Sequence, residues 1–465
     1  MRKLFSLSIV LLVSSYVFSQ GTRLLRQPDI SDKKIVFAYA NDLWVVDRSG
    51  GTAQRLTSFP GSESNPKFSP DGTMIAFSAQ YQGNTDVYVV PTVGGEPKRL
   101  TWHPGPDIVC GWSPDGKVVF TSSRESVPNG NTKIWQIGLN DGLPQSLPMP
   151  RAFRGEYSAD GKYFAYEFNL RWDDEWRNYR GGQNQPIWML DLQNYSLKKL
   201  PWQNSHDMQP VWLDKKIYFL SDRDSAMNLY SFDTQTEVLE QVTFFSEFDI
   251  KYLSSGGNAL IFEYYGDLYT LDPSTKKYSK LNIEVKGDFP WLQPQWVNAS
   301  DWLRNGSLSP SGKRALFEAR GEIITVPLKK GDPRNLTNSS GSRDHDPIWS
   351  PDGKSIAWFS DESGEYSLMI SGQDGLSKPR EIKISSSTFY YSPVWSPDSK
   401  FIAYTDHLQQ LWMMDVSSGK TTLVDKDTYL HPERTINPVW SPDSKWIAYT
   451  KPVTQSIPCN HGIFS

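Results

Sequence analysis

Acidic residues recur at one fixed distance from a repeated phrase, and this spacing is the first candidate for chemistry in the chain. The phrase reads Ser-Pro-Asp-Gly in its full form, and a carboxylate stands six residues before the serine position of several copies. These carboxylates belong to Glu63, Asp107, Asp207 and Asp249, with Asp344 as a later example. If the copies are related by rotation, the carboxylates lie on one pore rim that attracts cationic or N-terminal amine groups of peptides. The alternative is that each carboxylate caps its own loop by accepting backbone N–H bonds.

An insertion rich in arginine and tryptophan, RWDDEWRNYRGGQNQ at residues 171–185, is the second candidate. Guanidinium groups bind carboxylates through two parallel hydrogen bonds, so the loop can contact a peptide terminus. The same loop can instead pack on a neighbouring domain, with tryptophan as the anchor. The side chains concerned are Arg171, Trp176, Arg177, Tyr179 and Arg180. The sequence leaves both contacts open, with a peptide or with a domain.

Signatures of catalysis and of cofactor binding are not found in the sequence. There is no G-x-S-x-G elbow, no H-E-x-x-H, no G-x-x-x-x-G-K-[ST] and no paired C-x-x-C. The six histidines stand alone. Of the two cysteines, Cys110 is expected to be a buried strand residue, and a disulfide to Cys459 is not expected. We therefore expect no cofactor and no metal ion, and we assign no catalytic residue.

The repeated phrase indicates which elements carry these residues. It occurs as FSPDG at 68–72, WSPDG at 112–116 and 349–353, YSADG at 157–161, LSPSG at 308–312 and WSPDS at 395–399 and 440–444. Short runs of β-branched and aromatic residues, typical of strands, follow each copy. In the phrase, proline presets the turn, aspartate bonds the local backbone and glycine takes the left-handed position. Four strands in about 45 residues are typical of a β-propeller blade.

The spacing of the copies predicts an all-β chain with a six-bladed β-propeller followed by an incomplete second β-propeller. Counted with degenerate copies, the phrase marks ten units, and two long intervals hold the insertion and a connector. The predicted divisions are residues 1–20 for a signal peptide, 21–283 for the first propeller, 284–306 for the connector and 307–465 for about three and a half blades of the second propeller.

The N-terminal segment is predicted to be a targeting sequence. Arg2 and Lys3 precede an apolar stretch from Leu4 to Phe18 that is short for a membrane span. We expect a periplasmic or secreted protein without membrane attachment once the signal is removed. The formal net charge is −4, from 48 basic and 52 acidic residues. Because the two signs are intermixed and no basic stripe is present, the composition argues against nucleic acid as a partner.

The wording of the repeats, above all WRNYRGGQNQPIWMLD at residues 176–191, resembles the N-terminal half of tricorn-type serine peptidases. The resemblance covers nearly all of residues 22–450. It implies a six-bladed propeller, a propeller of the seven-bladed type, a helical region, a PDZ-like domain and an α/β core that cleaves oligopeptides. It also implies that oligopeptides are the partners, and it is compatible with a homo-oligomer of the full-length form. The family's tandem arginine pair before the third blade, associated with holding the substrate's C-terminus, is replaced here by HPGPDIVCGW.

Only about 160 residues follow the connector, whereas a seven-bladed ring needs roughly 300. We therefore expect the chain to end before the catalytic region and to be inactive alone. The predicted function is the non-catalytic substrate-access and scaffold portion of a periplasmic tricorn-like serine peptidase that degrades oligopeptides. The alternative is a stand-alone Tol-Pal-like β-propeller that acts by protein–protein contact. Repeats that start directly after the signal and continue past six favour the first interpretation.

Overall fold

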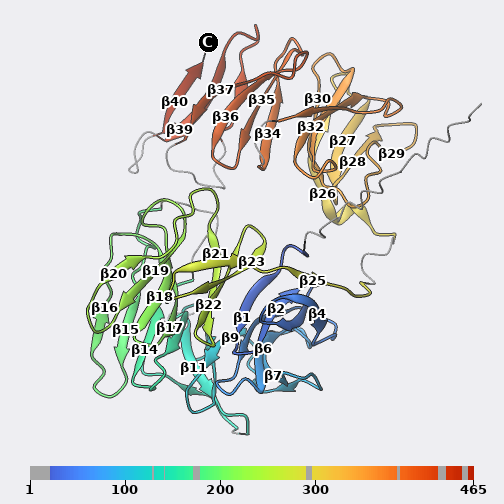
Figure 1. Ribbon diagram of the computed structural model, residues 1–465. Coiled ribbons are helices and arrows are strands. Elements are labelled where there is room, and N and C mark those ends of the chain that lie inside the picture. The colour runs from blue at the N-terminus through green and yellow to red at the C-terminus, as the bar shows by residue number, and fades with distance from the viewer. Residues whose placement is uncertain are drawn as a thin grey trace, which may run out of the picture. The chain divides into compact units, whose positions relative to one another are not determined.

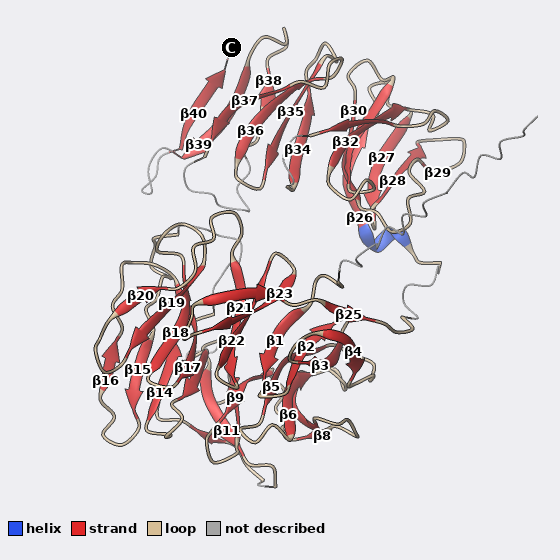
Figure 2. Ribbon diagram, in the orientation of Figure 1, coloured by secondary structure: helices blue, strands red, loops and turns tan. Residues whose placement is uncertain are grey.

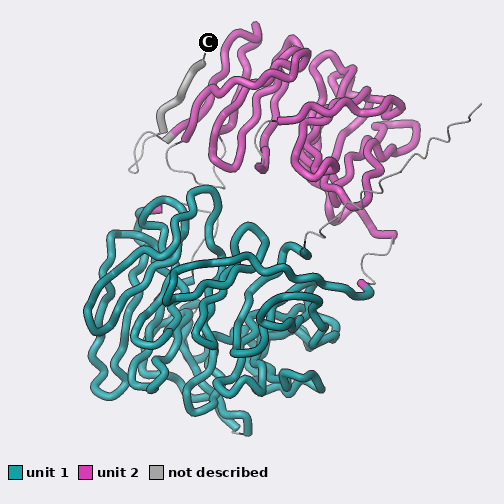
Figure 3. Tube along the Cα trace, in the orientation of Figure 1, with its two compact units in different colours: residues 1–172, 180–288 teal, residues 173–179, 289–465 magenta. Residues whose placement is uncertain are grey.

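The regular secondary structure of the described residues is almost entirely β-strand, as the runs between the repeated phrases predict. The computed structural model describes residues 21–127, 130–140, 142–170, 179–289, 296–384, 388–427, 436–452 and 459–464. Two compact units divide the chain, and Figure 3 colours them separately: unit 1 covers residues 1–172 and 180–288, and unit 2 covers residues 173–179 and 289–465. The division between the units falls within the predicted connector at 284–306. The limits of the connector stay a prediction.

Unit 1 contains six sheets in the described residues, each with four antiparallel strands that follow one another in sequence, and the first sheet has a fifth strand, from the end of the unit, that pairs in parallel (Figure 1). The first sheet holds β1 (Arg26–Ile30), β2 (Lys34–Tyr39), β3 (Asp42–Asp47), β4 (Gly51–Arg55) and β25 (Ile283–Val285). The second holds β5 (Glu63–Phe68), β6 (Met74–Ala79), β7 (Asp86–Pro91) and β8 (Lys98–Arg99), and the third holds β9 (Asp107–Trp112), β10 (Val118–Ser122), β11 (Lys133–Ile137) and β12 (Gln145–Ser146). The fourth holds β13 (Arg154–Tyr157), β14 (Tyr163–Glu167), β15 (Trp188–Asp191) and β16 (Leu197–Lys199). The fifth holds β17 (Asp207–Leu213), β18 (Lys216–Ser221), β19 (Asn228–Asp233) and β20 (Leu239–Gln241), and the sixth holds β21 (Ile250–Gly256), β22 (Ala259–Tyr264), β23 (Asp267–Asp272) and β24 (Lys277–Lys280).

Unit 2 contains four sheets in its described residues, after a 3₁₀ helix over Ala299–Trp302. The first sheet holds β26 (Leu303–Leu308), β27 (Arg314–Ala319), β28 (Glu322–Pro327) and β29 (Arg334–Asn335). The second holds β30 (Asp344–Trp349), β31 (Ser355–Ser360), β32 (Ser367–Gly372) and β33 (Arg380–Lys383). The third holds β34 (Tyr390–Trp395), β35 (Phe401–Asp406), β36 (Gln410–Asp415) and β37 (Thr421–Lys426), and the last holds β38 (Val439–Trp440), β39 (Ile447–Pro452) and β40 (Cys459–Phe464).

The first strands of the unit 1 sheets form a closed ring. They contact one another in the order β1, β5, β9, β13, β17 and β21, and β21 in turn contacts β1. Figure 2 shows β1, β5, β9, β17 and β21 towards the centre of unit 1, with β4, β8, β16 and β20 at its periphery. The ring is closed a second time at the outside, because β25 pairs in parallel with β4 and the Thr22 N–H donates to the Ile283 carbonyl over 2.7 Å. The first sheet therefore joins the beginning of unit 1 to its end.

The repeated phrase forms the tight turn between the first two strands of a sheet. The Ser69 hydroxyl donates to the Asp71 carboxylate over 2.6 Å and accepts the Met74 N–H over 2.9 Å. Gly72 follows with a φ of +69°, in the left-handed region that favours glycine. In the WSPDS copies, Ser399 takes this conformation with a φ of +60°, and its hydroxyl accepts the Asp352 N–H over 3.2 Å. A hydrogen bond between neighbouring turns thus accompanies the replacement of glycine by serine.

Buried apolar residues fill the space between successive sheets. One cluster joins Val36 of the first sheet to Phe77 of the second, and corresponding clusters join each later pair as far as the sixth sheet. The tryptophan of the phrase belongs to this packing, since the Trp112 indole N–H donates to the Lys67 carbonyl of the preceding sheet over 2.9 Å. Large side chains between sheets are expected of a propeller core, and they account for the aromatic content of 13%.

Candidate functional site

The candidate carboxylates share one structural position, at the start of the innermost strand of a sheet. Glu63, Asp107 and Asp207 are the first residues of β5, β9 and β17, and Asp249 directly precedes β21. Their exposed fractions are 4% for Glu63, 0% for Asp107 and Asp207, and 6% for Asp249. The structure therefore places all four side chains inside the protein.

Glu63 is surrounded by hydrogen-bond donors. Its carboxylate accepts the Leu43 N–H over 3.0 Å, the Thr57 hydroxyl and the Tyr81 phenol. Burial raises the pKa of Glu63 to about 7, although these three hydrogen bonds act in the opposite direction. The side chain thus joins the first sheet, through Leu43 and Thr57, to the second.

Asp107 and Asp207 each bind an arginine from the loop that follows the second strand of the same sheet. Asp107 pairs with the Arg124 guanidinium. Asp207 accepts the Ser221 hydroxyl over 2.6 Å and the Arg223 guanidinium over 2.8 Å, and the Arg223 side chain is 4% exposed. Burial raises the pKa of Asp207 against the influence of Arg223. A charge that is paired and hydrogen-bonded in this way offers little attraction to a ligand outside the sheet.

The remaining two carboxylates bind nearby groups. Asp249 accepts the Met227 N–H over 2.8 Å. In unit 2, Asp344 is the first residue of β30 and accepts the Trp358 indole N–H over 3.2 Å, together with the Ser339 hydroxyl. The pore-rim function of the carboxylates stays a prediction, and their burial and backbone contacts favour the loop-capping alternative.

A second row of carboxylates, which the sequence reasoning missed, begins the third strand of several sheets. Asp42 binds the Arg55 guanidinium over 2.6 Å, and Asp86 binds Arg99 over 2.6 Å. The threonine that follows each arginine by two residues accepts a backbone N–H from the third strand, as in Val87 to Thr101 over 3.0 Å. The signal in the sequence is an aspartate 13 residues before the arginine of the Arg-Leu-Thr run. These contacts fix the short outer strand to its neighbour.

The insertion is described only at its end. Arg171, Trp176 and Arg177 lie outside the described residues, and Tyr179 is half-buried. Arg180 binds the Asp222 carboxylate over 3.0 Å and the Asp222 carbonyl over 2.9 Å. Its guanidinium is therefore held by the loop that follows β18 in unit 1, which is a structural contact.

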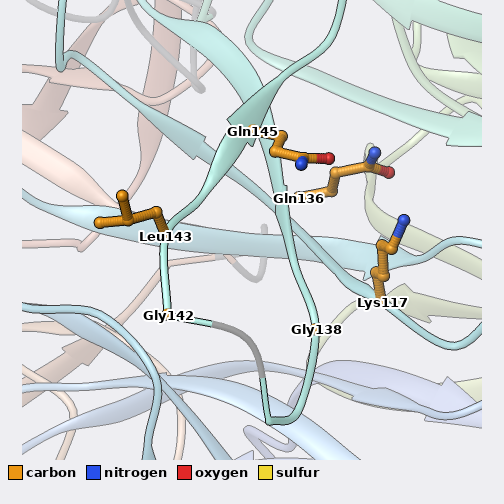
Figure 4. A pocket seen from close by; sticks show the side chains of 6 residues that line it. All are labelled: Lys117, Gln136, Gly138, Gly142, Leu143 and Gln145. Carbon is orange, nitrogen blue, oxygen red and sulfur yellow. The ribbon is translucent and has the colours of Figure 1, made fainter.

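A surface hollow of about 420 Å³ lies at the third sheet of unit 1. Its lining residues are Lys117, Gln136, Gly138, Gly142, Leu143 and Gln145. Figure 4 shows Leu143 pointing away from the polar side chains of Gln136 and Lys117. Gln136 accepts the Tyr157 phenol over 3.1 Å, so this amide already has a protein partner. Of the residues that the structure describes, no histidine, serine, cysteine or carboxylate lines the hollow, so its lining offers none of these groups as a nucleophile or general base.

The cysteine thiol and the potential metal ligands offer no further reactive site among the described residues. Cys110 is a free, buried thiol, and burial raises its pKa to about 11. A thiol with such a pKa is protonated at neutral pH and therefore a poor nucleophile. Among the described residues, no group of three or more His, Cys, Asp or Glu side chains is placed to hold a metal ion. In the same part of the chain, no helix has the length and apolar character needed to cross a membrane.

The closed ring of inner strands in unit 1 and the series of like sheets in unit 2 define an all-β protein of the β-propeller class. The all-β class and the β-propeller fold predicted from the repeats are thereby confirmed, and the predicted blade count stays a prediction. Within this class, the chain belongs to the tricorn protease N-terminal β-propeller family, whose model matches residues 22–277. Residues 303–459 match the tricorn protease second β-propeller domain.

Individual relatives agree with this assignment. A tricorn protease homolog of Saccharolobus solfataricus is 26% identical over 407 residues, which cover 86% of this chain and 37% of that protein. The crystal structure of the tricorn protease matches with a TM-score of 0.54 and 22% identity, over 95% of this chain and 43% of that chain, and shows the shared fold. The Tol-Pal system protein TolB of Francisella tularensis subsp. mediasiatica is 37% identical over 130 residues, or 27% of this chain and 29% of that protein. The chain spans less than half the length of the tricorn relatives that it matches.

Proposed function

We propose that this chain is the substrate-access and scaffold portion of a periplasmic, tricorn-like serine peptidase that degrades oligopeptides, and that it is non-catalytic by itself. The observation that carries the proposal is the match of residues 22–277 and 303–459 to the first and second tricorn propeller domains, in that order. The contacts of Asp207 and Arg180 support a scaffold role, since their charges are used to hold strands and loops together. The basic and apolar N-terminal segment supports the periplasmic location.

Peptide binding and peptide cleavage can be measured separately on the purified chain. A labelled oligopeptide library is titrated by fluorescence anisotropy, and a fluorogenic library is incubated with and without a serine-directed inhibitor. We expect binding without inhibitor-sensitive turnover. Turnover that the inhibitor abolishes would show that the chain is catalytic, and the absence of binding at any peptide concentration would contradict a role in substrate access.

A stand-alone binding module of Tol-Pal type is the second candidate, favoured by the local 37% identity to TolB. Such a module recognises a folded protein partner, so short peptides should not compete for its surface. Peptide titration therefore separates the two functions: saturable binding of short peptides supports the access role, and its absence leaves protein–protein contact as the better proposal. The greater coverage by the tricorn relative, 86% of this chain against 27%, makes the access role the preferred one.

A further inference from the structure

Charged residues of different sign meet around the axis of unit 1, at one register of the innermost strands. The register lies two residues before the serine position of the repeated phrase. It is occupied by Asp29, Lys67, Gly111, Glu156, Val211 and Leu253, in the order of the sheets. Because the residue type changes from sheet to sheet, this row is not visible as a motif. Propeller sheets surround a central channel, and the side chains of this row are candidates for occupying it.

Lys67 is the centre of the row. Its ammonium lies 2.5 Å from the Ser254 hydroxyl and 3.4 Å from the Asp29 carboxylate, and 5.4 Å from the centre of the Tyr252 ring. The Asp29 carboxylate also accepts the Phe68 N–H over 2.7 Å. The side chains of Lys67 and Asp29 are 12% and 6% exposed. The first, second and sixth sheets are thus joined through one buried ion pair.

The fourth sheet also contributes side chains that contact β21, the strand that carries Ser254 and Tyr252. Glu156 of β13 lies 3.4 Å from the Ser255 hydroxyl of β21, and Arg154 of β13 stands over the Tyr252 ring at 5.2 Å. Burial raises the pKa of Glu156 to about 8, and the Lys67 ammonium opposes this shift. In a ring of six sheets the fourth lies across from the first. The contacts of Glu156 and Arg154 are with β21 of the sixth sheet and pass the innermost strand of the fifth, so they run through the space that the innermost strands enclose.

The axial cluster, defined as Asp29, Lys67, Arg154 and Glu156, contains two basic and two acidic side chains. Charges removed from water are stable only when they are paired and hydrogen-bonded, and removal of one partner leaves the others uncompensated. A peptide that passed along the axis would have to separate these groups without replacing all their partners. Passage is therefore opposed by electrostatics as well as by the volume of the side chains.

We propose that the axial cluster closes the central channel of unit 1 to polypeptides. Peptides that bind unit 1 then do so at the ends of the channel or on the sheets, and the channel is not their route. The proposal rests on the ring and its contacts, so it holds whether the protein serves a peptidase or acts as a binding module.

Gly111 provides a probe of the channel at the level of the cluster. A Cβ atom added to Gly111 would meet no other atom within 4 Å. Gly111→Cys in a Cys110→Ala, Cys459→Ser background leaves one thiol, because the chain contains two cysteines. We measure how fast this thiol reacts with a small reagent, methyl methanethiosulfonate, and with a peptide probe, a short peptide bearing a maleimide. Each rate is divided by the rate of the same reagent with Glu96→Cys, a reference variant at an exposed loop residue. We expect the normalised rate of the peptide probe to be at least about tenfold below that of the small reagent.

Removing the central ammonium should open the channel. Lys67→Ala in the Gly111→Cys background should raise the rate of the peptide probe by about tenfold or more. Lys162→Ala is the matched control, since Lys162 forms a surface pair with Asp160 over 3.4 Å, and it should change neither rate. Equal normalised rates of the two reagents in the native background would overturn the proposal. If both reagents react slowly in the native background, the variants decide. Faster reaction of the peptide probe in Lys67→Ala supports closure of the channel by the axial cluster, and Glu156→Ala takes its place if Lys67→Ala does not fold. Unchanged rates in a folded variant overturn the proposal.

Discussion

At the residue scale, the buried carboxylate of Glu63 makes stability depend on pH. Its pKa in the folded protein is about 7, above the ordinary value of 4.5. Folding therefore favours the protonated form, and the stabilisation is full below about pH 4.5 and is lost as the pH rises through about 7. The groups around Glu63 suit an amide as well, because the Tyr81 hydroxyl can accept as well as donate.

Replacing Glu63 by glutamine should remove this pH dependence. We expect the free energy of unfolding of the native protein to fall, relative to that of Glu63→Gln, by on the order of 3 kcal/mol between pH 4.5 and pH 7. Urea unfolding across this pH range measures the difference. Glu96→Gln, at an exposed residue, is the control and should follow the native protein throughout. A constant difference between Glu63→Gln and the native protein would contradict the assignment.

The Asp207–Arg223 pair should be far more sensitive to substitution than a surface pair. Arg223→Met leaves the Asp207 carboxylate buried without its cation, which should cost about 3–5 kcal/mol. Lys162→Met breaks an exposed pair with Asp160 and should cost about 0–1 kcal/mol. Denaturant unfolding of both variants checks the contrast. If Arg223→Met were as stable as Lys162→Met, the pair would have no structural role.

The sequence predicted the position of the candidate carboxylates better than their environment. Their spacing from the phrase placed Glu63 and Asp107 at equivalent points of successive sheets, and the structure has both at the start of an innermost strand. Their partners come from other loops, such as Tyr81 for Glu63 and Arg124 for Asp107. Burial depends on these tertiary contacts, which no local pattern contains. The axial cluster was missed for a related reason, because its members share a register but not a residue type.

At the element scale, the turns of the repeated phrase were predictable because their chemistry is local. The serine hydroxyl, the aspartate carboxylate and the residue in the left-handed conformation lie close together in sequence. In the first full copy of the phrase, all the groups of the turn lie between Ser69 and Met74. The closing strand β25 was not predictable in this way. It pairs with β4 across more than 200 residues of sequence, and its short run has no counterpart in the repeat. Strand pairing at such separation is decided by the whole ring.

Ser399 provides a test of how a turn tolerates the loss of glycine. Its φ of +60° is costly for a side chain, and its hydroxyl offsets the cost by accepting the Asp352 N–H. Ser399→Ala keeps the conformational cost and loses the hydrogen bond, which should lower stability by about 0.5–1.5 kcal/mol. Ser399→Gly loses the same bond but relieves the backbone by about 0.4–1 kcal/mol, so it should be nearly neutral. Denaturant midpoints that rank alanine above glycine would contradict this account.

At the scale of the whole molecule, the closed ring implies that unit 1 is independently stable. Its inner strands contact in a complete circle, and β25 joins β4 at the outside. In unit 2, apolar side chains at the first sheet remain open to solvent, with Leu308 of β26 65% exposed and Leu328, just after β28, 64% exposed. Exposed apolar surface and unpaired strand edges favour association between molecules.

Separate expression of residues 21–290 and 291–465 should therefore give different outcomes. We expect the first piece to be soluble and to unfold cooperatively, and the second to aggregate. Size-exclusion chromatography and thermal unfolding followed by circular dichroism decide both points. A soluble, cooperatively melting second piece would contradict the expectation for unit 2, and an unfolded first piece would contradict the role of ring closure.

The parallel pair of β25 and β4 also has a mechanical consequence. Ile283–Val285 is the last strand of unit 1 along the chain, so any tension transmitted from the residues that follow acts first on this strand. The load then passes to β4 and, through the Thr22–Ile283 hydrogen bond, to the first residues of the ring. Under force, unit 1 should yield by detachment of β25 before any of its other sheets is disturbed.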